Sequence, residues 1–96
     1  RDSSHTVVRP FELVICADLG DVGPNPADIN DTMDRMSRFF KKVKSLGILP
    51  LTGGGDHLCS LPILRGIAYV NPVGMIHFDS HTDLFNSYFG GTMYTH

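Results

Sequence analysis

The sequence predicts an α/β fold in which a parallel β-sheet is flanked by helices, in the order β-α-β-α-β. Three short and nearly continuous apolar runs, at residues 11–17, 48–52 and 73–78, are typical of strands covered on both faces. Two segments between them, 29–43 and 58–69, carry apolar residues at the spacings of three and four that indicate helices. Short connections and right-handed crossovers would make the three strands parallel. Ligands bind such sheets at the carboxyl ends of the strands, so we look for a site there.

The first predicted helix has clear start and stop signals. A loop rich in glycine, proline and aspartate separates it from the strand at 11–17. Acidic and amide residues at 28–31 favour its start by capping and by charge, lysines suit its last turn, and Gly47 ends it. Its apolar residues form one stripe, made of Ile29, Met33, Met36, Phe40 and Val43. We therefore expect a helix of roughly four turns.

The second half of the chain repeats the alternation. The run at 48–52 ends in three glycines, and Pro62 fits the first turn of the next helix, where a missing N–H costs little. Asn71 and Pro72 end that helix, and the third predicted strand follows. Residues 84–96 are aromatic, glycine-containing and aperiodic, which predicts a loop over the edge of the sheet.

Composition excludes several classes of partner. The chain has 96 residues, of which 42% are hydrophobic and 19% charged, with a formal net charge of −2. No basic face argues for nucleic acid or for an anionic membrane, and no apolar run approaches the roughly 18 residues of a membrane span. Cys16 and Cys59 lie in apolar segments without Cys-x-x-Cys spacing, which predicts buried free thiols in a reducing compartment, the cytoplasm. Nothing at the start reads as a signal peptide, and the first residue, Arg1, indicates a fragment or a processed product.

Metal-capable side chains gather at two of the predicted strand ends. Asp79, His81 and Asp83 lie at i, i+2 and i+4, which a strand end would point to one side, and His57 follows the glycine-rich end of the neighbouring strand. Carboxylate and imidazole together suit Mn²⁺, Zn²⁺ or Fe²⁺. In the alternative, His81 and Asp83 cap a turn and His57 is a hydrogen-bonded residue at a helix start. Two such groups at neighbouring strand ends favour the metal, while strand alternation points His77 the other way.

Other polar residues near these strand ends have structural explanations of equal or greater weight. Asp56 suits either an acceptor that orients His57 or a cap of the following helix. The glycines at 53–55 lack the Lys-Ser/Thr of a phosphate-binding loop and more simply allow a tight turn. Asp18 and Asp21 follow the first predicted strand, and a role in the turn is the favoured interpretation.

The motifs resemble those of the ureohydrolase family, which includes arginase, agmatinase and guanidinobutyrase. The residues that carry the resemblance are Gly54-Gly55-Asp56-His57, then Leu61-Pro62-Ile63-Leu64-Arg65, and His77-Phe78-Asp79-Ser80-His81-Thr82-Asp83. The similarity covers most of residues 11–96. Within the family, Leu-Pro-Ile-Leu-Arg and Tyr94-Thr95-His96 are more similar to the agmatinase and guanidinobutyrase branch than to arginases.

The resemblance implies a three-layer α/β/α fold with a parallel sheet and a centre of two Mn²⁺ ions. His57 and Asp83 would bind one ion, His81 the other, and Asp79 would bridge them. A metal-bridging hydroxide would attack the guanidinium carbon of a small linear guanidino compound, agmatine or 4-guanidinobutanoate, to give urea and an amine. His96 would join Asp83 as a catalytic residue by shuttling protons near the amine. The resemblance also implies a homo-oligomer, a trimer or a hexamer.

The family pattern extends beyond this sequence. Its Asp-x-Asp metal ligands and its glutamate for the guanidinium would lie past residue 96, so we expect residues 1–96 to be the N-terminal part of a single ureohydrolase domain. By itself such a chain is expected to bind metal weakly and to be inactive. Two alternatives stay open: a noncatalytic fragment or pseudoenzyme that acts through partners, and a metal-dependent deacetylase on the same fold.

Overall fold

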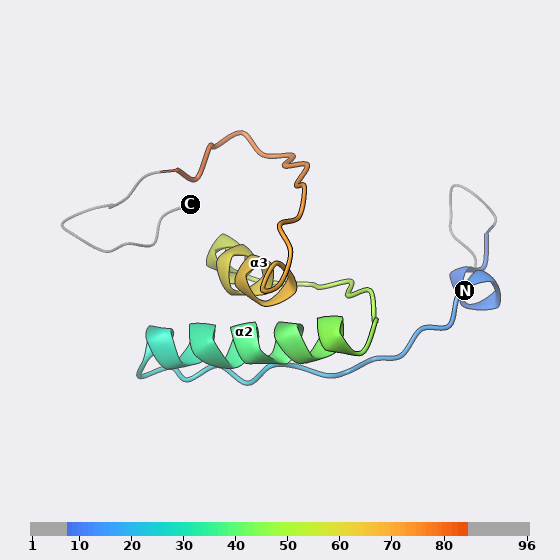
Figure 1. The fold of residues 1–96 in the computed structure, drawn as a ribbon, viewed down its shortest axis with the longest axis horizontal. Helices are drawn as coiled ribbons and strands as arrows, with labels where there is room; N and C mark the ends of the chain where they lie inside the picture. The colour runs from blue at the N-terminus through green and yellow to red at the C-terminus, as the bar shows by residue number, and fades with distance from the viewer. Residues whose placement is uncertain (1–7, 85–96) are drawn as a thin grey trace.

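The computed structural model describes residues 8–84, in which two packed helices form the centre of the chain (Figure 1). A short helix near the start, α1, is followed by the long helix α2, a 3-10 turn η1 and the helix α3. Figure 1 shows α2 and α3 side by side, with α1 on an arm that extends away from them. The bounds are α1 Pro10–Leu13, α2 Ile29–Ser45, η1 His57–Cys59 and α3 Ser60–Ile67.

Local capping fixes the ends of α2. The Asp28 side chain accepts hydrogen bonds from the backbone N–H groups of Asn30 and Asp31, at 2.9 and 3.2 Å, and so satisfies two donors that a helix start leaves without partners. At the other end Gly47 adopts φ +71°, and its N–H and that of Ile48 donate to carbonyls of the last turn. This left-handed stop favours glycine. The predicted first helix is confirmed.

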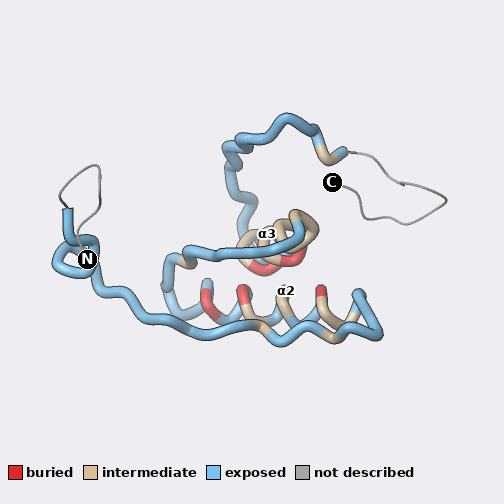
Figure 2. Tube along the Cα trace, turned by 180° about the vertical axis from the view of Figure 1, so that it is seen from behind, coloured by how far each residue is buried: buried red, intermediate tan, exposed pale blue. Residues whose placement is uncertain are grey.

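The core lies between α2 and α3. Met33, Phe40 and Val43 are buried on α2, and Pro62 and Gly66 are buried on α3. Figure 2 shows the buried stretches of the two helices on the sides that face each other. The Ser37 hydroxyl donates to the Pro62 carbonyl oxygen at 3.2 Å, which joins the two helices by a hydrogen bond. All three buried residues of α2 thus belong to the apolar stripe that the sequence predicted.

The second predicted helix is also confirmed, with narrower bounds. Its first residues form the 3-10 turn η1, and α3 ends at Ile67 instead of continuing to Tyr69. Pro62 lies in the first turn of α3, as predicted. A small residue at position 66 allows close approach to α2, because a Cβ built there would lie 2.7 Å from the Cβ of Phe40.

The predicted sheet is not confirmed, because residues 8–84 contain no strand. The assignment of residues 11–13 to a strand is wrong, since they belong to α1. The rest of that run and the runs at 48–52 and 73–78 are irregular, and Ile15, Leu51 and Phe78 are almost fully exposed. A strand needs a neighbour for its backbone N–H and C=O groups, and no segment in this part of the chain provides one.

Two further predictions can be compared with the structure. Cys16 and Cys59 are free thiols, as expected, but Cys16 is exposed and Cys59 only half-buried, so the prediction that both are buried is wrong. Among the described residues, no helix combines the length and the apolar character that crossing a membrane requires. The loop predicted at 84–96 lies outside the described residues except for Leu84.

Candidate metal centre

The start of η1 places His57 at the junction between the glycine-rich segment and α3. The Asp56 carboxylate accepts a hydrogen bond from the Leu58 N–H at 2.7 Å, and the Asp56 carbonyl accepts one from Cys59 at 3.2 Å. Of the two roles that the sequence left open for Asp56, the structure therefore shows capping. The cap fixes the backbone that carries His57, which is only partly exposed.

Two carboxylates from the segment before Leu84 meet the His57 imidazole. Its Nδ1 atom lies 2.8 Å from Asp83 Oδ2 and 3.3 Å from Asp79 Oδ2. The side chains of Asp79 and Asp83 are 23% and 19% exposed, so both carboxylates are largely covered. The sequence predicted that these three side chains come together, and the structure places them in contact.

His77 joins the same group, so the prediction that it points away is wrong. Its Nε2 atom lies 3.6 Å from Asp79 Oδ2 and 3.8 Å from Asp83 Oδ2, and its ring centroid lies 5.4 Å from that of His57. The prediction misapplied strand alternation, because residues two positions apart, such as 77 and 79, lie on the same face of a strand. The spacing itself offered a clue, since His77 precedes Asp79 by two residues just as His81 follows it by two. We call His57, His77, Asp79 and Asp83 the His–Asp cluster.

His81 contacts Asp79 from the other side of the carboxylate. The His81 backbone N–H donates to Asp79 Oδ1 at 2.9 Å, and the ring Nδ1 lies 3.3 Å from the same oxygen. The His81 side chain is 66% exposed and is not part of the His–Asp cluster. Asp79 thus presents Oδ2 to the cluster and Oδ1 to His81.

The electrostatics of Asp79 follow from these contacts. The hydrogen bond from the His81 backbone is the largest influence, and it lowers the pKa of the Asp79 carboxyl because it stabilises the charged form. Partial burial acts in the opposite direction, and the nearby imidazoles of His57, His77 and His81 lower the pKa further. Asp79 is therefore a carboxylate at neutral pH.

The arrangement fits a divalent transition-metal ion. One ligand atom from each member of the His–Asp cluster lies within 4.8 Å of the others, and two imidazoles with two carboxylates are a donor set that such ions accept. Asp83 Oδ1 is a buried atom that has no hydrogen-bond partner within residues 8–84. Asp83 also has φ +54°, a left-handed backbone conformation that aspartate adopts more readily than most residues. A buried acceptor without a donor is the feature that a bound cation would explain.

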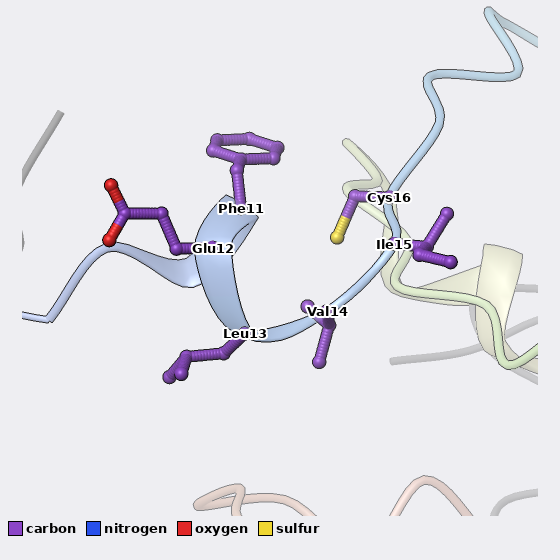
Figure 3. A pocket seen from close by; sticks show the side chains of 6 residues that line it. All are labelled: Phe11, Glu12, Leu13, Val14, Ile15 and Cys16. Carbon is purple, nitrogen blue, oxygen red and sulfur yellow. The ribbon is translucent and has the colours of Figure 1, made fainter.

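The remaining candidates lie elsewhere or beyond the described residues. Asp18 accepts a hydrogen bond from the Gly20 N–H at 2.8 Å, the turn role that was favoured for it, and neither Asp18 nor Asp21 belongs to the cluster. His96 lies outside the described residues. A hollow near α1 (Figure 3) is formed within one short segment and holds none of the cluster residues; it is lined by Phe11, Glu12, Leu13, Val14, Ile15 and Cys16.

Comparison with known proteins decides the family. The model of the arginase family matches residues 1–96. The chain belongs to the arginase family. The match confirms the predicted resemblance to the ureohydrolases. Membership of the family implies the arginase-like α/β fold, and residues 8–84 show helices of such a fold but no sheet.

Similar members of the arginase family are named for guanidino substrates. Guanidinopropionase from Pseudomonas aeruginosa is 46% identical over 89 residues, which cover 93% of this chain and 28% of that protein. Mitochondrial guanidino acid hydrolase from Homo sapiens is 40% identical over 93% of this chain and 26% of its own length. Mitochondrial agmatinase from Gallus gallus is 37% identical over 98% and 28%, respectively. The chain therefore spans about a quarter of the length of these relatives.

Proposed function

We propose that the chain is the N-terminal part of a single ureohydrolase domain that hydrolyses a linear guanidino compound to urea and an amine. The observation that carries the proposal is the meeting of His57, Asp79 and Asp83, contributed by the two motifs that mark the arginase family. Relatives named agmatinase and guanidinobutyrase support agmatine and 4-guanidinobutanoate as the leading substrates. A relative named guanidinopropionase adds a shorter acid to the compounds worth testing.

The proposed cofactor is Mn²⁺, with two ions in the complete site. His57 and Asp83 would hold one ion, His81 the other, and Asp79 would be shared. The contacts of Asp79 support this division, because one of its oxygens faces His57 and the other faces His81. When bound, such ions lower the pKa of water and supply a nucleophile at neutral pH.

The residues of the chain have separate tasks in this proposal. The carboxylates of Asp79 and Asp83 bring negative charge to a partly covered place, which holds cations there and attracts a guanidinium group. Asp83 Oδ1 has no donor within the described residues and so is available to accept a hydrogen bond from a reacting water. His96, proposed as the second catalytic residue, would carry protons to the departing amine.

We also propose a location and an assembly for the complete protein. A cytoplasmic location follows from the free thiols Cys16 and Cys59, although relatives from Homo sapiens and Gallus gallus are named as mitochondrial. A homo-oligomer, trimer or hexamer, is proposed for the complete protein.

The test is urea release by the longest natural protein that contains this chain, assayed with Mn²⁺ and agmatine or 4-guanidinobutanoate. We expect Asp79→Ala to lower the rate by at least about a hundredfold, because a shared carboxylate is lost. Asp34→Ala, which removes an exposed acid of α2, is the matched control and should retain the rate. Urea release that survives Asp79→Ala would refute the proposal, and acetate release from an acetylated amine would instead indicate a deacetylase.

A further inference from the structure

The side of α2 that faces away from α3 carries charges whose signs are separated along the helix. At about 100° per residue, five charged positions lie more than about 120° from the centre of the buried stripe of α2. We call them the outer face of α2; they are Asp31, Asp34, Arg35, Arg38 and Lys42. Both acids precede the three bases. The helix dipole favours this order only in the first and last turns, so it does not account for the charges in the middle.

Most of these charges are open to solvent, although the segment before α2 runs along the same helix (Figure 1). Asp31 is half-buried, and the other four residues are exposed. Arg35 is used within the chain, because its Nη2 atom lies 2.7 Å from Asp31 Oδ2. Asp34, Arg38 and Lys42 form no ion pair with any described residue. One acid and two bases of the outer face therefore remain for another molecule.

A second copy of α2 supplies the complementary charges when it lies antiparallel to the first. With the two helices crossing near residue 36, Asp34 of one copy lies opposite Arg38 of the other, since both are two residues from the crossing. Asp31 then lies opposite Lys42, because these residues are five and six positions from the crossing. A two-fold axis forms each pair twice, so one register leaves no charge of the outer face without a partner.

We propose that the outer face of α2 is a two-fold contact between two copies of the chain, in which the acidic half of each helix lies on the basic half of the other. The inference rests on the homo-oligomer of the proposed function and chooses between its two forms. A trimer has no two-fold axis, whereas a hexamer made of two trimers has such axes between its halves. The contact contains no residue of the His–Asp cluster, so it depends on neither the metal nor the substrate.

Ion pairs on an exposed helix face make the contact sensitive to salt. Each such pair contributes little by itself, but like charges in the wrong register repel, so the pattern fixes the orientation of the two copies. The Debye length falls from about 10 Å at 0.1 M salt to about 3 Å at 1 M, which screens the pairs. We therefore expect the two halves of the hexamer to separate at high salt.

The experiment is sedimentation velocity of the longest natural protein that contains this chain, with activity measured alongside. The unsubstituted protein should have the mass of a hexamer at about 0.1 M salt and of a trimer at about 1 M. Arg38→Glu and Asp34→Lys should each give a trimer at both salt concentrations, because each places like charges opposite one another. An equal mixture of the two variants should recover a complex of hexamer mass, since acidic and basic faces meet again.

Two controls separate pairing from folding and from total charge. The double variant, Asp34→Lys with Arg38→Glu, carries both substitutions and should recover the hexamer because the charges are exchanged. Lys44→Glu makes the same change in net charge as Arg38→Glu, on an exposed residue of α2 outside the outer face, and should keep the hexamer. Far-UV circular dichroism checks that the helices are retained.

Three results would overturn the inference. They are a trimer or a monomer for the unsubstituted protein at low salt, a hexamer that persists in both single variants, and a mixture and double variant that stay at the lower mass. Failure of the proposed function is distinct, because it is the absence of urea release that depends on Asp79, whatever the mass. All variants of the outer face should release urea, since the contact lies outside the metal centre.

Discussion

Replacing Gly66 by alanine tests whether α2 and α3 pack as closely as the structure shows. A Cβ at position 66 would lie 2.7 Å from both the Phe40 Cβ and the Ser37 carbonyl oxygen, and 3.0 Å from the backbone nitrogen of Lys41. Ordinary van der Waals contact begins at 3.4 Å. Two of these three atoms belong to the backbone of α2, so a side-chain rotation cannot relieve the contact. The helices have to separate along the line that joins them.

The expected size of the effect is set by two opposing contributions. Overpacking of a close contact costs about 1–3 kcal/mol, while alanine in place of glycine inside a helix gains about 1 kcal/mol. Steric contact with backbone atoms places Gly66→Ala toward the upper end of the cost, which leaves a net loss of about 1–2 kcal/mol in the free energy of unfolding. For a chain of this size the midpoint of thermal unfolding should fall by about 5 °C or more.

Thermal unfolding followed by far-UV circular dichroism measures this change, because the two helices supply most of the signal. Gly23→Ala is the matched control, since a Cβ there meets no atom within 4 Å and the backbone is not left-handed. The control should unfold near the temperature of the unsubstituted chain. If Gly66→Ala is as stable as Gly23→Ala or more stable, the helices do not approach each other as described.

Three other predictions concern the helix ends and the metal centre. Asp28→Ala should lower the free energy of unfolding in urea by about 1 kcal/mol through loss of the cap of α2, and Asp34→Ala, on the same helix, should not; equal losses would speak against the cap. The pKa of Asp31 is lowered, first by the hydrogen bond from the Asn25 side chain and then by Arg35. The charged Asp31 therefore stabilises the folded chain at pH values above the ordinary pKa of 3.8, and this stabilisation is lost as the pH falls through the lower pKa of the folded state. Asp31→Asn should make the helix signal in far-UV circular dichroism depend less on pH in the acid range. An unchanged dependence on pH would contradict the stabilising role of the Asp31 carboxylate. Saturating Mn²⁺ should raise the thermal midpoint and a chelator should reverse the rise, while a midpoint indifferent to Mn²⁺ would exclude a site in the folded chain.

The helices could be predicted from the sequence because their determinants are local. The stripe from Ile29 to Val43 has the helical period, and Asp28 and Gly47 lie where a cap and a left-handed stop are needed. Each of these interactions joins residues within a few positions of one another. Sequence spacing alone therefore carries the information that decides them.

The strands could not be predicted with the same certainty, because pairing is not local. An apolar run such as 48–52 favours a strand only when a neighbouring segment supplies hydrogen-bond partners and cover. In residues 8–84 no neighbour is present, and Leu49 and Leu51 are almost fully exposed. The same apolar composition therefore accompanies an irregular segment within residues 8–84.

The candidate centre was predicted in part. The meeting of His57, Asp79 and Asp83 was predicted from two motifs that resemble those of ureohydrolases, and the structure places the three side chains in contact. The prediction that His77 points away from Asp79 was wrong, because residues two positions apart lie on the same face of a strand, and the structure places His77 beside Asp79. The ligand roles themselves, and the role of His96, stay predictions.

The contact between His57 and Asp83 affects how firmly the chain between them is held in place, in addition to bringing two candidate metal ligands together. It closes a loop that contains all of α3 and the extended segment after it. An ion held by both residues would act as a reversible cross-link, and closing a loop of this length costs about 3.5 kcal/mol of conformational entropy in the simplest polymer account, which binding of the ion would offset. The extended segment that carries Phe78 would then be tethered to the helix pair at both of its ends, so metal supply would govern how firmly this part of the chain is ordered.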